Sequence, residues 1–310
     1  MGDLLVVGSI ALDGVETPFG ARDPMVGGSA VFFSYAASLF HEVRVVGVIG
    51  DDYPEGELQQ LADRGADLRG IERRAGRSFY WKGRYSYDLL DRETLETRLG
   101  VFAEFNPRIP QEFRDTQLVF LGNIDPRLQL GVLDQIEKPA LVVCDTMNYW
   151  IEQARDPLLE LLAKIDLVML NDSEARELSG DWNIYRAARW ILERGPRAVV
   201  IKQGVYGAVF VNELRIFYVP AYPLEEVFDP TGAGDAFAGG FMGELARSSD
   251  LSEEGMRRAM VYGAAMGSFA VEKFSVDRLK EIGPNEVSER VEQFAELVRF
   301  ELGDGSGGDG

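Results

Sequence analysis

One stretch of the sequence combines small residues with a carboxylate in a way that suits phosphoryl transfer. Residues 229–241 read Asp-Pro-Thr-Gly-Ala-Gly-Asp-Ala-Phe-Ala-Gly-Gly-Phe. Gly232, Ala233 and Gly234 leave the backbone N–H groups at a helix start unobstructed, where they and the helix dipole favour an anion. Asp235 lies in the same first turn and could serve as general base for a hydroxyl that attacks a bound phosphoryl group. A plainer interpretation is that Asp235 only favours the helix dipole.

Several other chemistries are excluded by residues that the sequence lacks. The chain has one cysteine, Cys144, and one histidine, His41, so it cannot build an intrachain disulfide or a Cys/His zinc site. A Ser-His-Asp triad would depend on His41 alone. The sequence has no Gly-x-x-x-x-Gly-Lys-Ser/Thr loop, and Phe237 stands where a dinucleotide fingerprint needs glycine. Carboxylates, backbone amides, basic side chains and a hard metal ion remain.

Composition narrows the class of partner. The 310 residues include 32 basic and 51 acidic side chains, a formal net charge of −19, which disfavours binding to a phosphate backbone. No apolar run approaches a membrane span, and the N-terminus does not resemble a signal peptide. We therefore expect a cytoplasmic protein that binds small molecules rather than nucleic acid or a membrane.

The elements that must position these residues follow an α/β pattern. Short apolar runs predict buried parallel strands at residues 4–7, 43–49, 118–121, 140–144, 167–170 and 198–201. Segments between them predict crossover helices at residues 29–40, 55–64, 127–136, 158–164 and 183–194. The C-terminal third predicts a hairpin at 208–211 and 215–219, then helices at 235–246, 253–271 and 286–302. A mostly parallel sheet with helices on both faces follows.

Two segments interrupt this pattern. Residues 13–25 and 77–105 lie outside the α/β alternation, and the second alternates in polarity with a period of two, as a strand does. We interpret both as a small β layer that could cover a cleft within a single domain of residues 1–302. The glycine-rich residues 303–310 are expected to form a flexible tail.

The alternating segment carries a row of aromatic residues, Phe79, Trp81, Tyr85 and Tyr87. Such a row could stack on a nucleobase or on the face of a sugar. Ordinary packing between the strands is one alternative. A subunit contact that would form a homodimer through these strands is another.

Four motifs together resemble those of the PfkB, or ribokinase-like, family of carbohydrate and nucleoside kinases. They are Gly27-Gly28-Ser29-Ala30, Asn171-Asp172-Ser173-Glu174, Lys202-Gln203-Gly204 with Gly207, and the stretch 229–237 described above. They occur in the order and spacing of that family. The resemblance implies a three-layer sandwich with a mostly parallel central sheet, helices on both faces and a small β-strand lid.

The resemblance also implies roles for individual residues. Asp235 would deprotonate the acceptor hydroxyl, while the amides of Gly232, Ala233 and Gly234 hold the charge that develops on the transferred phosphoryl group. Asp13 would bind acceptor hydroxyls. Otherwise it is a surface turn residue, because it precedes a glycine.

Further roles concern the acceptor and the donor. Gly27 and Gly28 would let the backbone approach the acceptor. Asn171 and Glu174 would organise Mg²⁺ through water, although the same pair suits a helix cap. Lys202, Gly204 and Gly207 would line the nucleotide, although a glycine-rich turn explains these glycines equally well. In some family members the position of Asp229 helps to bind a monovalent cation such as K⁺.

Three departures from the family bear on the substrate. Val31-Phe32-Phe33 stand where many relatives have an asparagine that contacts a sugar hydroxyl. Residues 145–150 lack the arginine that would pair with an acidic substrate, so sugar acids are disfavoured. The late loop at residues 271–275 lacks the usual glycine near adenine.

The resulting expectation is an ATP-dependent phosphotransferase, with Mg²⁺ as cofactor, that phosphorylates a hydroxyl of a sugar or related polyol. A nucleoside kinase of the same family is the first alternative. A non-catalytic nucleotide- or sugar-binding regulator on the same fold is the second, because a fold does not fix a function.

Overall fold

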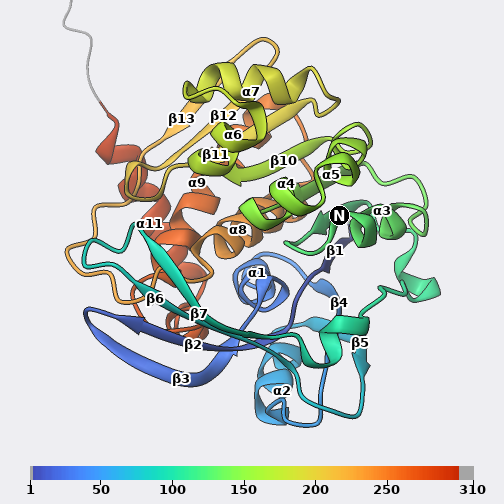
Figure 1. Ribbon diagram of the computed structural model, residues 1–310. Coiled ribbons are helices and arrows are strands. Elements are labelled where there is room, and N and C mark those ends of the chain that lie inside the picture. Colours follow the sequence, from blue (N-terminus) through green and yellow to red (C-terminus); the bar gives the residue numbers. More distant parts are fainter. Residues whose placement is uncertain (1–2, 300–310) are drawn as a thin grey trace, which may run out of the picture.

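The computed structural model describes residues 3–299 and contains two β-sheets (Figure 1). The larger sheet has nine strands in the order β13-β12-β11-β10-β9-β8-β1-β4-β5. Their bounds are β1 (Leu4–Val7), β4 (Val43–Ile49), β5 (Ala66–Arg73), β8 (Leu118–Leu121), β9 (Leu141–Asp145), β10 (Leu167–Asn171), β11 (Ala198–Lys202), β12 (Ala208–Asn212) and β13 (Ile216–Val219). The strands from β11 to β5 are parallel, and β12 and β13 are antiparallel at one edge.

The two faces of this sheet are covered by different helices because successive strand residues point to opposite faces. Leu4 and Val6 belong to one hydrophobic core, and Leu5 and Val7 belong to the other. The first core contains α1 (Ser29–Ala37), α2 (Glu55–Asp63), α8 (Ala233–Ser248), α9 (Glu253–Ala270), α10 (Asp277–Glu281) and α11 (Pro284–Leu297). The second contains α3 (Pro126–Leu133), α4 (Asn148–Gln153), α5 (Arg155–Leu162), α6 (Asp172–Ser179) and α7 (Ile184–Leu192), with the 3₁₀ helices η1 (Gly100–Glu104) and η2 (Gln111–Phe113).

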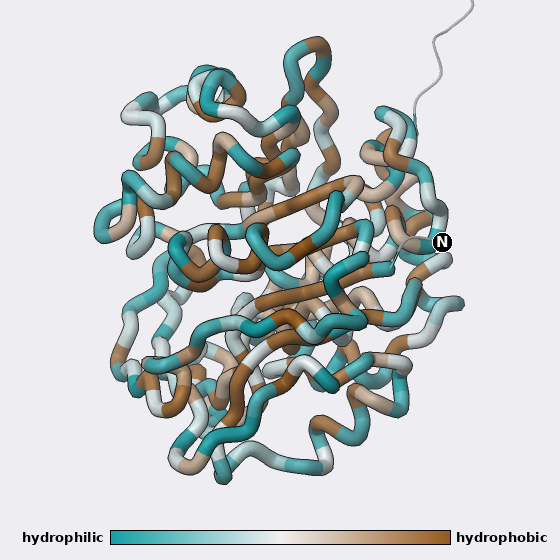
Figure 2. The backbone as a smooth tube through the Cα atoms, turned by 90° about the vertical axis from the view of Figure 1, so that its right-hand side faces the viewer, coloured by the Kyte–Doolittle hydropathy of each residue, from teal (hydrophilic) through white to brown (hydrophobic). Residues whose placement is uncertain are grey.

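Hydropathy along the backbone agrees with this arrangement. In Figure 2 the central strands are mostly hydrophobic, and the surrounding helices alternate between hydrophobic and hydrophilic positions. Strands buried on both faces need continuous apolar sequence, whereas a surface helix needs only one apolar stripe.

The smaller sheet, which we call the lid sheet, has four strands in the order β3-β2-β6-β7. They are β2 (Ala11–Thr17), β3 (Gly20–Gly27), β6 (Phe79–Tyr85) and β7 (Arg92–Arg98), and they lie together at the lower left of Figure 1. Trp81 pairs with Asp13 on the neighbouring parallel strand, and Tyr85 pairs with Arg92 on the antiparallel strand. Paired residues share a face, so these four side chains lie on one face of the lid sheet.

The predicted α/β architecture is confirmed, with differences of detail, among them the short helices α4 and α10, which lie outside every predicted helix. Strand β5, at the edge of the large sheet, was missed because its sequence, Ala-Asp-Leu-Arg-Gly-Ile-Glu-Arg, has no continuous apolar run. The C-terminal helix begins at Pro284 and ends at Leu297 rather than spanning 286–302. The predicted tail at residues 303–310 lies outside the described residues. Within residues 3–299, no helix combines the length and apolarity needed to cross a membrane, and the cytoplasmic location stays a prediction.

Candidate active site

The carboxyl ends of three neighbouring parallel strands bring polar side chains to one edge of the large sheet. Asp145 ends β9, Asn171 ends β10 and Lys202 ends β11. The Lys202 Nζ donates to the Asp145 Oδ2 at 2.6 Å, and both side chains are largely buried. Ligands of α/β folds bind at this edge because loops there are free to vary.

The small residues of the 229–241 stretch form an open turn at the N-terminus of α8. Gly232 caps the helix with φ +76°, and a Cβ on it would lie 2.3 Å from the Phe32 ring. A Cβ on Gly234 would lie 2.9 Å from the Lys202 Nζ. The Lys202 ammonium therefore lies directly against the turn, and its charge adds to the positive end of the helix dipole.

The amides of this turn are not equivalent. The N–H of Ala233 donates to the Pro230 carbonyl at 3.3 Å. No protein acceptor within residues 3–299 takes the N–H of Gly232 or Gly234. The N–H of Asp235 likewise has no protein acceptor among residues 3–299, so the open amides are those of Gly232, Gly234 and Asp235, and Ala233 contributes less than the sequence predicted.

Asp235 lies half-buried in the first turn of α8 and has an unusual pKa. Burial raises the pKa to about 7, and the charge of Asp145 raises it further, while Lys202 and Arg92 act in the opposite direction. A carboxylate whose pKa lies near neutrality can take a proton from a hydroxyl and later release it. The geometry is compatible with the predicted role of general base.

Asp13 lies within β2 and is not a surface turn residue, so that alternative is wrong. A Cβ on Gly27 would lie 1.9 Å from the Asp13 Oδ2, so only glycine allows this approach. The backbone N–H of Gly28, which has φ +95°, lies near enough to the Asp13 carboxylate to lower its pKa. Burial raises the pKa of Asp13 to about 8, and the charges of Asp229 and Asp235 contribute to the rise.

Asn171 and Glu174 form a capping box at the start of α6. Asn171 Oδ1 accepts from the N–H of Glu174 at 2.8 Å, and Glu174 Oε2 accepts from the N–H of Asn171 at 2.7 Å. The helix-cap interpretation is thus realised. Burial raises the pKa of Glu174 to about 7, with a further contribution from Asp145.

The oxygens at this edge suit a magnesium ion held mostly by other ligands. Glu174 keeps one carboxylate oxygen outside the capping box, and Asp145 lies close enough to raise the pKa of Glu174. Within residues 3–299, no group of three or more acidic, His or Cys side chains forms a metal cage. Mg²⁺ keeps waters and phosphate oxygens as ligands, so these oxygens fit a water-mediated site.

The carboxylate of Asp229 braces the open turn through two hydrogen bonds to backbone N–H groups. Its Oδ1 accepts from the N–H of Thr231 at 2.9 Å, and its Oδ2 accepts from the N–H of Ser275 at 3.2 Å. The side chain is fully buried, and burial raises its pKa. This bracing is the role that the structure gives to Asp229, and a monovalent cation there stays a prediction.

A pocket of about 780 Å³ opens beside the turn and extends toward α9. Lys202 and Gly234 lie on its wall, together with Gly204, Gly207 and Phe237. The turn at η3 (Gly204–Tyr206) and Gly207, with φ +102°, form part of this wall. Its volume is within the range of small-molecule sites and is sufficient for a nucleotide.

The tips of the lid sheet also reach this pocket. Phe19, between β2 and β3, and residues 87–90, between β6 and β7, line it together with Lys202. Tyr85 is closer to the turn, where its hydroxyl hydrogen-bonds with that of Thr231 at 3.1 Å. The lid sheet is therefore in contact with the turn that begins α8.

The aromatic row does not act as one surface. Phe79 stacks on Phe102 with ring centroids 5.2 Å apart, which is packing. Trp81 and Tyr85 share the lid face of Asp13, and Tyr87 is exposed at the pocket. Packing and pocket lining thus both occur along the row, at different residues.

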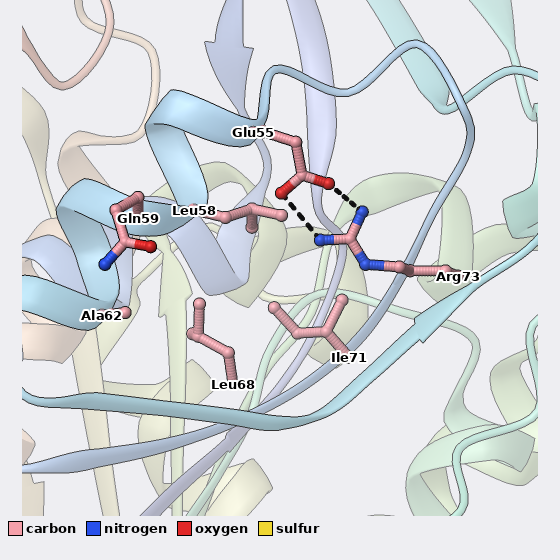
Figure 3. A pocket seen from close by; sticks show the side chains of 7 residues that line it. All are labelled: Glu55, Leu58, Gln59, Ala62, Leu68, Ile71 and Arg73. Atoms are coloured by element: carbon pink, nitrogen blue, oxygen red, sulfur yellow. Dashed lines mark hydrogen bonds and ion pairs between the residues drawn. The ribbon is translucent and has the colours of Figure 1, made fainter.

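A second pocket lies elsewhere, between α2 and β5 (Figure 3). Its volume is about 170 Å³, and Leu58, Leu68 and Ile71 form its floor beneath the ion pair of Glu55 and Arg73. It contains none of the predicted site residues. The acidic edge beside α8 is the stronger candidate for catalysis.

The site also contains residues that the sequence reasoning did not assign. Asp145 was considered only as the start of a segment that lacks an arginine, yet it pairs with Lys202 and influences Asp235 and Glu174. Its position at the end of a buried strand was the available signal. Arg92 and Thr231 gave no comparable signal, because their places depend on how the lid sheet meets α8.

Comparison with known proteins agrees with this geometry. Residues 26–281 match the family described as pfkB family carbohydrate kinase. The chain belongs to this family of kinases. The predicted resemblance is thereby confirmed, and so is the prediction that the protein is a kinase.

Individual relatives of this pfkB kinase include enzymes for nucleosides and for sugars. A cytidine kinase of Thermococcus kodakarensis is 33% identical over 260 residues, 82% of this chain and 92% of the relative. A nucleoside kinase of Burkholderia thailandensis, solved with inosine, has a TM-score of 0.79 at 21% identity and covers 94% of this chain and 97% of its own. A ribokinase of Cryptococcus neoformans, solved with ADP, has a TM-score of 0.75 at 20% identity, covering 94% and 100%. The ribokinase-like fold is therefore confirmed.

Proposed function

We propose that this pfkB kinase transfers the γ-phosphoryl group of Mg·ATP to a hydroxyl of a nucleoside, with cytidine as the first candidate. The observation that carries the proposal is the position of Asp235. This half-buried carboxylate lies on the same helix start as the open amides of Gly232 and Gly234, near Lys202, and close enough to Asp13 to raise its pKa.

Each residue then has a task in an in-line transfer. Asp13 accepts a hydrogen bond from an acceptor hydroxyl, and Asp235 takes the proton of the hydroxyl that attacks. The amides of Gly232 and Gly234 and the ammonium of Lys202 stabilise negative charge on the phosphates. A magnesium ion, when bound with water near Glu174 and Asp145, neutralises part of the charge on the donor phosphates.

Donor and acceptor would occupy adjoining spaces. The pocket of about 780 Å³ suits the donor nucleotide, because it ends at Lys202 and Gly234. The acceptor lies beneath the lid sheet at Asp13, on the other side of Asp235. The lid tips line the donor pocket, and closure of the lid sheet would exclude water from both spaces.

The lid sheet favours a nucleoside over a simple sugar. Trp81 lies directly across from Asp13 on the neighbouring strand and shares its face, and it is partly buried. A ribose hydroxyl bound at Asp13 would place a base toward the indole, which can stack on it. The cytidine kinase among the relatives supports the same class of acceptor.

A coupled assay of ADP release from Mg·ATP tests the proposal directly. The acceptors are cytidine, uridine, adenosine, inosine, guanosine, ribose, fructose and inositol. Asp235→Asn should lower turnover at least about a hundredfold, the usual scale for a positioned base, while ATP binding is kept. Asp156→Asn is the matched control, because Asp156 is an exposed acid in the first turn of α5.

The outcomes separate the candidate functions. Turnover on a nucleoside that is lost only in Asp235→Asn supports the proposal. Turnover on a sugar but on no nucleoside would replace the acceptor class and keep the mechanism. Unchanged turnover in Asp235→Asn would remove the base, and ATP binding without any turnover would favour a regulator.

A further inference from the structure

One arginine of the lid sheet differs from the other cations of its two strands. Lys82, Arg84 and Arg98 each pair with a carboxylate, at Asp23 (3.0 Å), Glu16 (2.8 Å) and Glu96 (3.0 Å) respectively. Arg92 has no carboxylate within ion-pair distance among residues 3–299, although the chain carries 51 acidic residues. Its side chain interacts with Tyr85 and Trp81 instead, and an arginine without a carboxylate partner is available to an anionic ligand.

Strand register places Arg92 on the face of the lid sheet that meets the active site. It pairs with Tyr85, whose hydroxyl contacts Thr231 in the turn that begins α8. Its guanidinium lies 5.1 Å from the centre of the Trp81 ring. Gly83 lies between the two aromatic residues. The indole of Trp81 occupies the space beside it, because a Cβ on Gly83 would lie 2.2 Å from the indole. The two paired cations Lys82 and Arg84 belong to the opposite face.

The charge of Arg92 affects the pKa values of carboxylates on both the acceptor side and the donor side of the expected reaction. It lowers the pKa of Asp13 and of Asp235, on the acceptor side. It also lowers the pKa of Glu174, on the proposed magnesium side. A group in transit between the donor phosphates and the acceptor hydroxyl must pass between these carboxylates.

We propose that Arg92 is a further catalytic residue, a cation that the lid sheet brings to the phosphoryl group during its transfer. The inference rests on the proposed function above. As the bond from the acceptor oxygen to the γ-phosphorus forms, the bond from that phosphorus to the β,γ-bridging oxygen breaks. The acceptor proton goes to Asp235, ADP leaves with the bonding electron pair, and Arg92 stabilises the charge on the equatorial oxygens.

Carrying this cation on the lid sheet has a consequence for specificity. Lys202 and the amides of α8 belong to the large sheet and its covering helices, and they would contact the donor whether or not an acceptor is bound. Arg92 depends on the position of the lid sheet, and Tyr85 ties that position to Thr231. Transfer to water would therefore be slow until an acceptor closes the lid sheet.

The test compares Arg92→Ala and Arg92→Lys with Arg84→Ala, a matched removal of an arginine from the opposite face of the lid sheet. With cytidine, Arg92→Ala should lower kcat at least about a hundredfold and change the acceptor KM by less than about threefold. Arg92→Lys should recover part of the loss, because it restores the charge but not the planar fork. Arg84→Ala should stay within about threefold of the wild type.

A second measurement uses ADP with aluminium fluoride, which mimics the phosphoryl group in transit. Arg92→Ala should bind this probe at least about tenfold more weakly than the wild type does, and should bind ADP alone with unchanged affinity. A raised acceptor KM with unchanged kcat would overturn the proposal and make Arg92 a contact to the acceptor. Equal losses in Arg92→Ala and Arg84→Ala would also overturn it, because they would indicate damage to the lid sheet.

The two proposals fail in different ways. If the wild type phosphorylates none of the nucleosides, the proposed acceptor class fails, while the binding of ADP with aluminium fluoride still decides the role of Arg92. If the wild type acts on cytidine and all Arg92 variants match it in kcat and in probe binding, only the role of Arg92 fails.

Discussion

The pH dependence of kcat/KM should report the half-buried carboxylate of Asp235 at the start of α8. The pKa of Asp235 is about 7 because burial and the charge of Asp145 both raise it. The base acts in its ionised form, so activity is gained as pH rises through this pKa. The ionised fraction of a group with that pKa increases about tenfold between pH 6 and pH 8, and kcat/KM should follow it.

Asp145→Asn should move this acid limb toward lower pH. The substitution removes a charge that raises the pKa of Asp235, and it also frees Lys202, whose charge lowers that pKa. Both changes act in the same direction. A neighbouring charge of this kind shifts a buried carboxylate by about one unit or more, so the limb should move from about pH 7 to about pH 6 or below.

The assay is the initial rate from pH 5 to pH 9 in buffers of constant ionic strength, with acceptor and Mg·ATP both well below their KM values, so that the profile reports the free enzyme. Asp156→Asn should reproduce the wild-type limb. A wild-type profile that is flat from pH 5.5 to pH 8 would falsify the assignment of Asp235 as base. A limb that stays in place in Asp145→Asn would refute the electrostatic reasoning, even if the limb itself is present.

Three further predictions concern the residues around the base. Asp13→Asn should raise the free energy of unfolding, measured by urea titration, by at least about 2 kcal/mol at pH 8 and by almost nothing at pH 4. The reason is that the pKa of Asp13 rises from 3.8 in the unfolded chain to about 8 in the folded protein, so the wild type loses stability as pH rises between these values. Equal effects at both pH values would contradict this. Trp81→Ala should raise the KM for cytidine at least about fivefold with the KM for ATP unchanged, and Trp81→Phe should recover most of it; equal changes in both KM values would indicate packing alone. Gly232→Ala should lower both the melting temperature and kcat, because φ is +76° and the new Cβ would clash with Phe32. The control is Gly180→Ala, at φ +74° with open space around it, which should lower the melting temperature only slightly. Similar losses in both variants would show that the Phe32 ring moves to accommodate the Cβ.

The central sheet could be predicted from sequence because burial on both faces leaves a simple pattern. Strand β1 is Leu-Leu-Val-Val with every residue buried, and such runs recur at each interior strand. The edge strand β5 and the lid strand β7, which is exposed along its whole length, carry no such pattern. Their pairing partners, not their own sequences, determine that they are strands.

The candidate site could be predicted where one local motif supplies the geometry, and not where distant elements meet. Asp235 and Gly232 follow each other closely on one helix start, so their types and spacing were informative. Asp13 precedes a glycine and looked like a turn residue. Gly14 is instead in the middle of β2, where a Cβ would lie 2.8 Å from the Tyr80 hydroxyl, and this close approach explains the glycine. Arg92 depends on the register between two lid strands, which the sequence does not reveal.

The acidic character of the site bears on how it can accept a nucleotide that is itself strongly negative. Asp13, Glu174 and Asp235 all have raised pKa values, so near neutral pH each holds a proton for part of the time. The site has four carboxylates, those three and Asp145. Before the donor binds, it therefore carries less negative charge than four fully ionised carboxylates would. Lys202 and Arg92 offset part of what remains, one from the fixed sheet and one from the lid sheet. A donor that arrives with its own magnesium brings the rest of the positive charge, and the base is freed to ionise when that charge is in place.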